Sequence, residues 1–209
     1  MEQSDIWNNI FANSTKTPTK DDWIDRFSKY LEAKKSNTVV DLGCGRGGNS
    51  IYLKEQGFNV VACDFSFTAI RFINEKFPDI QTRCFDMTKE FPDNIKDVGI
   101  VLASLSTHYF SFNDTVRLYK NISTMLEPKG YFIFRVNSKK EFELKNKHLL
   151  ADIIEDDYYL LKCGRSKRYF DINSISALLN DFTILEINEA SLGYFGNEKH
   201  FIEGVAQKN

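Results

Sequence analysis

The sequence has no long apolar stretch and no strong excess of charge of either sign. Its longest apolar runs, at 98–105 and 131–134, fall far short of the roughly 20 residues that span a membrane. No basic segment precedes the first apolar residues, which argues against a secretory signal. The 27 basic and 29 acidic residues leave a formal charge of -2, so the composition gives no basic surface for a nucleic-acid backbone. We expect a cytoplasmic protein without a membrane or nucleic-acid partner.

Cysteines are few and widely spaced, at Cys44, Cys63, Cys84 and Cys163. No two of them have the CxxC spacing of a metal or redox motif, and a chain of 209 residues needs no disulfide to fold. We therefore expect reduced thiols and no metal site. The length is typical of one α/β domain, which we expect to span residues 1–209.

Short β-branched runs alternate with helical patterns, which is typical of a doubly wound parallel sheet with helices on both faces. The expected strands are 38–42, 58–64, 80–86, 98–104 and 131–136, and the expected helices are 21–35, 49–56, 66–77, 111–127 and 173–179. The last two runs, 182–190 and 200–208, are separated by a loop without helical period and are predicted to pair antiparallel. Residues 138–170 are charged and only partly helical, and we expect them to form an insertion over the sheet.

A glycine cluster follows the first predicted strand, in the segment 39–50 with the sequence VVDLGCGRGGNS. Gly43 and Gly45 let the backbone turn tightly and approach a ligand without a Cβ, and the next helix begins with free N–H groups. So many glycines in one turn predict a nucleotide-cofactor loop. Because Gly43, Gly45 and Gly48 also have the GxGxxG spacing of a dinucleotide site, the glycines alone leave the cofactor open.

Asp41, two residues before Gly43, favours a cationic cofactor. A carboxylate at the end of this strand would repel the pyrophosphate of NAD, whereas it suits the amino and sulfonium groups of S-adenosylmethionine. We also expect no second catalytic domain of the kind that an NAD-linked oxidoreductase has. The charge therefore predicts S-adenosylmethionine, with the oxidoreductase as the weaker alternative.

The second and third predicted strands also end in acids. Asp64 follows Asp41 by 23 residues, which suits a carboxylate that accepts hydrogen bonds from ribose hydroxyls. Phe65 beside it can cover an adenine face. Asp86 can accept from the adenine amine while the Met87 backbone N–H meets a ring nitrogen. Because the carboxyl ends of parallel strands meet at one edge, we expect one crevice lined by these acids, although each acid alone would also suit a helix N-cap.

The segments DLGCGRGGNS, GFNVVACDFS, CFDMT, GIVLASLSTHYF and LEPKGYFIFRVNS together resemble the class I S-adenosylmethionine-dependent methyltransferases, and the first two are especially similar to their tellurite-resistance-like branch. The resemblance covers residues 7–137 motif by motif. It implies a Rossmann-like sheet of seven strands in the order 3-2-1-4-5-7-6 with strand 7 antiparallel. The fourth motif, ASLSTH, lacks the Asn/Asp-Pro-Pro-aromatic signature of methyltransferases that act on nucleic-acid bases or glutamine.

The resemblance also implies which positions hold the cofactor. These are, for the methionine end, Asp41, Gly43, Cys44 and Gly45; for the ribose, Asp64; for adenine, Phe65, Asp86 and Met87; and, facing the sulfonium, Ser104.

Three residues after the fourth and fifth strands are candidates for catalytic work on the acceptor. His108 can take a proton near neutral pH, or it can simply pack at the start of the next helix. Arg135 and Asn137 can orient an acceptor that carries an anionic group, or they can be ion-paired or solvated residues at a strand end.

Other segments are candidates for closing and shaping the site. Within the N-terminal part, 1–35, Trp7 and Phe11 can form a lid that excludes water, or they can pack on the following helix. Arg46 can pair with the cofactor carboxylate or with a nearby acid. The segments 165–170 and 194–200 can shape the acceptor pocket, and the basic residues of the first also allow contact with RNA.

We expect methyl transfer from S-adenosylmethionine to a small-molecule acceptor by in-line displacement, with S-adenosylhomocysteine as product. The acceptor atom (O, N or S) is left open, as is the choice between monomer and homodimer. The alternatives are an RNA or protein methyltransferase and a module that binds S-adenosylmethionine without catalysis.

Overall fold

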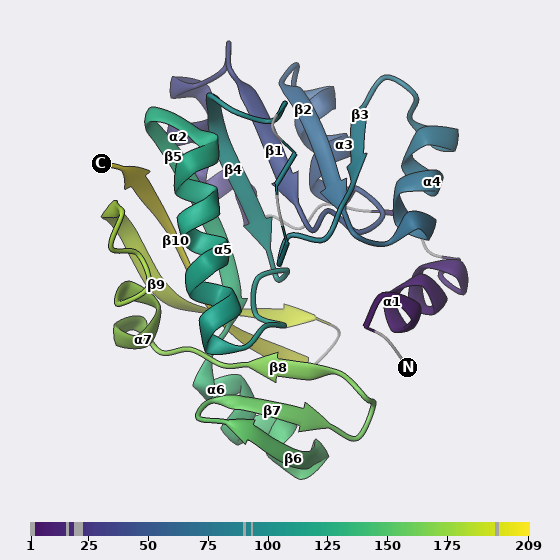
Figure 1. Ribbon diagram of the computed structural model, residues 1–209, viewed down its shortest axis with the longest axis vertical. Helices are drawn as coiled ribbons and strands as arrows, with labels where there is room; N and C mark the ends of the chain where they lie inside the picture. Colours follow the sequence, from purple (N-terminus) through teal and green to yellow (C-terminus); the bar gives the residue numbers. More distant parts are fainter. Residues whose placement is uncertain (1–2, 16, 19–22, 90, 93, 195–196) are drawn as a thin grey trace.

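The computed structural model describes residues 3–15, 17–18, 23–89, 91–92, 94–194 and 197–209. Seven strands form one sheet in the order β3-β2-β1-β4-β5-β10-β9 (Figure 1). They are Thr38–Leu42 (β1), Asn59–Asp64 (β2), Gln81–Cys84 (β3), Val98–Ser104 (β4), Leu126–Asn137 (β5), Phe182–Tyr194 (β9) and Asn197–Lys208 (β10). Strands β1 to β5 are parallel, and β10 is antiparallel to both β5 and β9. The predicted order and the antiparallel strand are confirmed.

The middle of the sheet is buried on both faces, which explains its continuous apolar sequence. In β1, Val40 pairs with Val61 of β2 on one side and with Val101 of β4 on the other. All seven residues of β4 except Ser104 are buried. Since these strands run in the same direction, their carboxyl ends meet at one edge, where open α/β sheets bind ligands.

Helices cover both faces of the sheet. On one face lies α5 (Phe112–Met125), whose Leu118 and Ile122 are fully buried with Val101 of the sheet. On the other face, α3 (Gly48–Glu55) contributes Leu53. Each such apolar side chain stabilises the fold by roughly 1.5–3 kcal/mol. Helix α4 (Phe67–Lys76) follows the N-cap Ser66, whose hydroxyl accepts from the Ala69 N–H.

The boundary between α5 and β5 differs from the prediction. Ser111 caps α5 as its sequence suggests, and its hydroxyl accepts from the Asp114 N–H. The strand, however, begins at Leu126 rather than at 131, because the chain joins β4 before its register shifts between Val98 and Ile100. Lys129 has a φ of 60° in this irregular stretch.

The predicted loop between the last two strands is wrong. Strands β9 and β10 continue through it, and Ser191 pairs with His200 while Leu192 pairs with Lys199. The two strands are held together here by backbone hydrogen bonds, and the sequence shows no alternation of apolar and polar residues. Hydrophobic periodicity therefore could not predict strand structure in this segment. Residues 195–196 lie outside the described part of the chain. The short helix before these strands, α7, covers only Ile172–Ser176.

Residues 138–170 form a layer beneath the carboxyl edge of the sheet (Figure 1). The helical part was predicted and consists of α6 (Lys139–Glu141) with the π-helical and 3-10 turns Phe142–Asn146 (η2) and Lys147–Leu149 (η3). A second sheet in the order β6-β7-β8 was not predicted; its strands are Leu150–Glu155, Tyr158–Leu161 and Ser166–Arg168. The rings of Phe142 and Tyr159 stack at 4.2 Å between the two parts.

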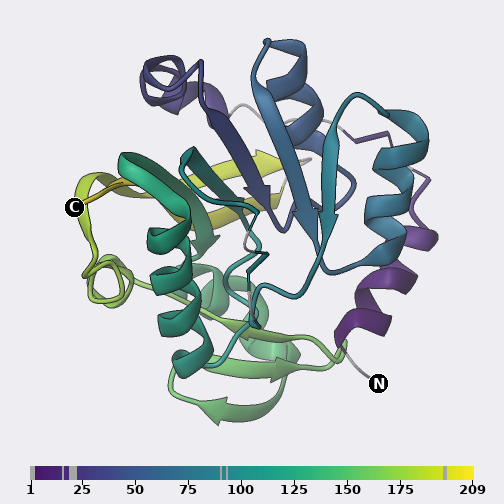
Figure 2. The same cartoon turned by 45° about the horizontal axis from the view of Figure 1, so that its top comes forward.

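The N-terminal segment contains two helical pieces. Helix α1 (Gln3–Ala12) was not predicted as a helix; it contacts α4 and lies near the β7–β8 turn (Figure 2). The predicted helix 21–35 is a 3-10 turn, η1 (Ile24–Phe27), followed by α2 (Ser28–Ala33); its first two residues lie outside the described part of the chain. Among the described residues, no helix is long and apolar enough to span a membrane.

Candidate functional site

The glycine loop is held tightly against the end of β2. The N–H groups of Gly43 and Cys44 both donate to the Cys63 carbonyl oxygen, at 2.7 and 2.9 Å. Gly43 has a φ of +74°, and a Cβ there would lie 2.3 Å from the Ser106 Cβ. Only glycine fits this position, for two reasons. Residues with a side chain rarely adopt this positive φ, and their Cβ would clash with Ser106 in the β4–α5 loop.

Asp64 lies at the end of β2 with its carboxylate fixed from two sides. The Gly45 N–H donates to Oδ2 and the Ser66 N–H donates to Oδ1, both at 2.8 Å. The side chain is 5% exposed, and burial raises its pKa, while these backbone hydrogen bonds oppose the rise. A carboxylate has about four lone-pair sites, so each oxygen can still accept one hydroxyl from a ligand.

Asp86 has one oxygen engaged by its own turn. Oδ1 accepts from the Thr88 N–H at 2.9 Å and from the Thr88 hydroxyl at 2.7 Å. Oδ2 lies 3.6 Å from the Lys89 ammonium on the surface. The turn therefore orients the carboxylate and leaves Oδ2 able to accept from a ligand amine.

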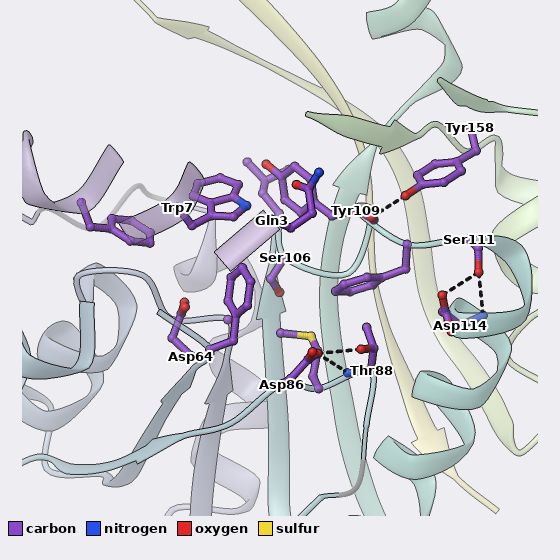
Figure 3. A pocket seen from close by; sticks show the side chains of 16 residues that line it. Gln3, Trp7, Asp64, Asp86, Thr88, Ser106, Tyr109, Ser111, Asp114 and Tyr158 are labelled. Atoms are coloured by element: carbon purple, nitrogen blue, oxygen red, sulfur yellow. Dashed lines mark hydrogen bonds between the residues drawn. The ribbon is translucent and has the colours of Figure 1, made fainter. Parts of the chain in front are cut away.

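A cavity of about 370 Å³ lies between these loops, within the size range of small-ligand sites (Figure 3). Its wall is mostly apolar, with carboxylates at Asp64, Asp86 and Asp114. The lining residues are Gln3, Trp7, Phe11, Gly43, Asp64, Phe65, Asp86, Met87, Thr88, Leu105, Ser106, Tyr109, Phe110, Ser111, Asp114 and Tyr158. Five predicted cofactor residues thus meet around one space: Gly43, Asp64, Phe65, Asp86 and Met87.

Helix α1 covers this cavity. The rings of Trp7 and Phe11 stack at 5.6 Å, and Trp7 meets Tyr109 edge-on at 5.1 Å (Figure 3). The Ser66 hydroxyl donates to the Asn8 side-chain oxygen at 2.6 Å, which ties α1 to the start of α4. None of the residues of α1 is buried. Trp7 and Phe11 therefore lie over the cavity, in the position predicted for a lid.

Four predicted cofactor residues do not line the cavity: Asp41, Cys44, Gly45 and Ser104. Asp41 is 1% exposed and accepts a hydrogen bond of 2.5 Å from the Ser50 hydroxyl of α3. Burial raises the pKa of Asp41 to about 6, against the effect of that hydrogen bond. Ser106 reaches the cavity in place of Ser104, and its hydroxyl donates to the Leu42 carbonyl at 2.7 Å.

The three predicted catalytic residues lie apart from this cavity. His108 is 1% exposed, its ring lies 4.3 Å from that of Tyr109, and neither ring nitrogen has a hydrogen-bond partner among the described residues. Burial lowers the pKa of His108 well below its usual value, and the cations Lys167, Lys199 and Arg165 lower it further, so the imidazole is neutral at physiological pH.

Arg135 and Asn137 lie at the end of β5. The Arg135 guanidinium is 4.8 Å from the Trp23 ring and 4.6 Å from the Phe201 ring. The Asn137 side chain is 1% exposed, and its amide has no hydrogen-bond partner among the described residues. Both residues are therefore buried, which argues against the alternative that they are solvated residues at a strand end.

Two predicted basic features have structural partners. Arg46 donates to the Ser14 carbonyl at 2.6 Å and lies 3.8 Å from the Phe72 ring. In the segment 165–170, Arg168 is 5% exposed, forms an ion pair with Glu155 and donates to the Phe110 carbonyl. Tyr169 and Phe170 of the same segment are buried.

Several lining residues were not predicted, and only some could have been. Tyr109 and Phe110 follow the fourth motif directly, so their aromatic pair could have been assigned to the site. Tyr158, whose hydroxyl donates to the Tyr109 carbonyl at 2.9 Å, lies in the unpredicted second sheet. Gln3 reaches the cavity only because α1 packs there, and no local sequence pattern predicts the position of this helix.

Comparison with known proteins finds similarity to methyltransferases. A profile described as "Methyltransferase domain" matches residues 40–134, which contain β2, β3, β4 and most of β1 and β5. The Bacillus subtilis protein YqeM is 30% identical over 143 residues, which cover 65% of this chain. The matched segment and the fold are similar to those of the class I S-adenosylmethionine-dependent methyltransferases. The match spans 58% of the length of YqeM.

Solved methyltransferase structures have the same fold. A Methanosarcina mazei S-adenosylmethionine-dependent methyltransferase superposes with a TM-score of 0.76 at 20% identity, covering 88% of this chain and 96% of that one. TehB of Haemophilus influenzae superposes with a TM-score of 0.63 at 18% identity, covering 97% and 67%. TehB is also 49% identical over 37 residues, covering 18% of this chain and 13% of TehB. S-adenosylmethionine is the cofactor of this methyltransferase family.

The site is compatible with that cofactor on its own chemistry. The backbone approaches the cavity without side chains at Gly43, and Asp64 retains acceptor capacity for two hydroxyls. Aromatic and sulfur-containing side chains, those of Phe65 and Met87, form apolar walls suited to a purine ring.

Proposed function

We propose that this methyltransferase transfers a methyl group from S-adenosylmethionine to a small-molecule acceptor. The single observation that best supports the proposal is the Asp64 carboxylate, which two backbone N–H groups hold at the wall of the cavity. A carboxylate that is prearranged in this way can accept both hydroxyls of a ribose without reorganising.

The proposed binding mode follows the order of the strands. Asp64 would hold the ribose, while Phe65, Met87 and Asp86 would contact adenine, with the Asp86 Oδ2 accepting from its amine. The methionine end would lie along the loop 43–45 and towards Ser104. Asp41 does not line the cavity, so we assign it an electrostatic effect on the cationic cofactor and a structural link to α3 through Ser50.

When bound, S-adenosylmethionine supplies an activated methyl group: a lone pair of the acceptor forms the new bond to the methyl carbon while the carbon–sulfur bond breaks and its electrons remain on sulfur. The protein then has to align the acceptor and exclude water. Trp7 and Phe11 would exclude water on the α1 side. Movement of α1 would admit the cofactor, since this helix buries none of its residues.

His108 is proposed as the group that takes a proton from a protonated acceptor. Its neutral imidazole has acceptor capacity, and neither ring nitrogen is engaged by the described residues. The same burial that keeps it neutral makes it a weak base, so this role suits an acceptor that loses its proton easily.

The remaining parts of the proposal concern the extent of the domain, its location in the cell, its oligomeric state and the class of acceptor. We propose that residues 1–209 act as one methyltransferase domain, with 138–170 over the acceptor side, in the cytoplasm, as a monomer or homodimer. Four free thiols are compatible with a reducing compartment. An RNA acceptor is disfavoured because Arg168, in the basic run, is engaged by Glu155.

Calorimetric titration with S-adenosylhomocysteine and with NAD tests the cofactor site. We expect binding of the first alone. Asp64→Asn should weaken it by about 10- to 100-fold, since a hydrogen bond to a charged group contributes about 1.5–3 kcal/mol. The matched control is Asp79→Asn on the surface, which should bind as the wild type does. Binding of NAD but not of S-adenosylhomocysteine would contradict the proposal.

A further inference from the structure

A second cavity, of about 760 Å³, adjoins the proposed cofactor cavity. It lies at the carboxyl end of β5, between η2 and the start of β10, and is lined by Arg135, Lys145, Lys199 and Phe201 among others. Leu105 lines both cavities. The two spaces therefore meet at the end of β4, where a bound methyl donor and its acceptor would have to come together.

The backbone at this meeting point is unusual. Leu105 has a φ of 55°, which is a rare conformation for a residue with a branched side chain. Its N–H donates to the Arg135 carbonyl at 2.7 Å, and this hydrogen bond fixes the turn to the adjacent strand. A strained turn of this kind costs conformational free energy and often occurs where a site needs a particular side-chain direction.

Basic groups outnumber acidic groups around the second cavity. Lys145 donates to the Glu198 carbonyl oxygen, which brings its ammonium across from η2 to β10. The two acidic side chains have partners: Glu141 accepts from the His200 N–H at 2.9 Å, and Glu198 accepts from the Ser191 hydroxyl at 2.6 Å.

The charge of Arg135 also has to be considered with its neighbours. Glu203 faces it across the β5–β10 pair, and Glu203 forms an ion pair of 2.6 Å with Arg26. The guanidinium lies between the Trp23 and Phe201 rings, which restrict its orientation. An oriented guanidinium that lines one cavity together with two lysines suits a carboxylate or another oxyanion.

Two buried polar side chains are close in sequence to residues that line the second cavity. His108 follows Leu105 by three residues and lies within electrostatic reach of Lys199. Asn137 follows Arg135 by two residues. Both side chains lack hydrogen-bond partners among the described residues although each is 1% exposed. Such groups are costly to bury, and a polar ligand or water nearby would offset that cost.

We infer that the second cavity is the acceptor site and that it takes a small acceptor whose anionic group is held by Arg135 and Lys199, with Leu105 at the junction where the acceptor meets the cofactor cavity. This inference rests on the proposed methyl transfer. Arg135 and Lys199 would act as specificity-determining residues, because they contact the part of the acceptor that does not react.

Matched pairs of probes test the inference by binding as well as by turnover. The pairs are 3-mercaptopropionate and 1-propanethiol, β-alanine and propylamine, and 4-hydroxybenzoate and phenol. Each probe is titrated calorimetrically into protein saturated with S-adenosylhomocysteine, and is also assayed for S-adenosylhomocysteine formation from S-adenosylmethionine. In at least one pair, the anionic member should bind at least ten-fold more tightly than its neutral partner.

Two variants assign this preference to the cavity. Lys199→Met and Arg135→Met should each reduce the preference about ten-fold or more, since a hydrogen bond to a charged group contributes about 1.5–3 kcal/mol. Their affinity for S-adenosylhomocysteine should not change, because neither side chain lines the first cavity. Lys120→Met, at an exposed position of α5, is the matched control and should keep the preference. If Arg135→Met, at the more deeply buried position, does not fold, Lys199→Met still tests the inference.

The possible outcomes distinguish failure of the acceptor assignment from failure of the proposed methyl transfer. Equal binding within every pair, no response to any anionic probe, or a preference that survives both variants would overturn the acceptor assignment while S-adenosylhomocysteine still bound. Failure of the wild type to bind S-adenosylhomocysteine would overturn the proposed function and the inference together.

Discussion

The two halves of the site are built in different ways. The part of the cofactor half around Gly43, Asp64 and Asp86 is made by short loops at the ends of β1, β2 and β3, where the backbone itself sets the geometry through hydrogen bonds such as Gly45 N–H to Asp64. Side chains of α1, the β4–α5 loop and β7 complete its wall. The acceptor half is made by side chains from β5, η2 and β10, segments up to about 65 residues apart in the chain. Backbone geometry leaves few sequences that fit, whereas a wall of side chains can change its chemistry without changing the fold.

Substitution of Gly43 should have the largest effect on the cofactor half. In Gly43→Ala the new Cβ would meet Ser106 at 2.3 Å, so binding of S-adenosylhomocysteine should fall by more than 100-fold. The control is Gly57→Ala, where φ is +84° and nothing lies within 4 Å. This control should lose only about 1–2 kcal/mol of unfolding free energy, from the left-handed backbone alone, and keep its affinity. Equal binding by both variants would show that the close approach at Gly43 is unimportant.

The two tryptophans separate stability from binding. Trp23 is fully buried, so Trp23→Ala should lower the free energy of unfolding by about 3–5 kcal/mol. Trp7 lies on α1, which buries none of its residues, so Trp7→Ala should cost less than about 1 kcal/mol. Trp7→Ala should nevertheless weaken S-adenosylhomocysteine binding about ten-fold, because the lid would lose its stacked ring. Chemical denaturation and calorimetry measure both effects; an unchanged affinity in Trp7→Ala would argue for packing without a lid function.

Asp41 should show a conflict between stability and binding. Its folded pKa of about 6 lies above that of the unfolded chain, so the folded state holds a proton that the unfolded chain releases between about pH 4 and 6. This carboxyl therefore lowers stability progressively as pH rises through that window, by up to roughly 3 kcal/mol. Asp41→Asn should stabilise the ligand-free protein above pH 6, yet weaken binding of cationic S-adenosylmethionine more than that of S-adenosylhomocysteine. Thermal unfolding from pH 4 to 8 checks the first effect, and equal stability at pH 8 would contradict it.

The same contrast explains what the sequence could predict. That Gly43 and Asp64 lie around one cavity could be predicted because strand, turn and acid follow one another within a short stretch, and local patterns report local geometry. Strand order was predicted through the resemblance of several such stretches taken together. Ser106 lines the cavity and Ser104 does not, and the sequence does not show the positive φ of Leu105 between them, where the chain leaves the regular strand.

The least predictable parts depend on contacts between distant segments. Tyr158 reaches the cofactor cavity only because β7 pairs within a second sheet that has no clear alternation in the sequence. The glutamine at position 3 donates to the Gly164 carbonyl, a contact across 161 residues that docks α1 near the β7–β8 turn. Tertiary packing decides such positions, and a short periodic pattern carries no information about them.

A crystal structure of the protein with S-adenosylhomocysteine bound would test the central claim most directly. The account predicts the ribose hydroxyls within hydrogen-bond distance of the Asp64 carboxylate, adenine between Phe65 and Met87, and the sulfur atom directed towards Leu105 and the second cavity. A ligand bound elsewhere, or one whose sulfur points away from Leu105, would contradict the assignment of the two cavities to cofactor and acceptor.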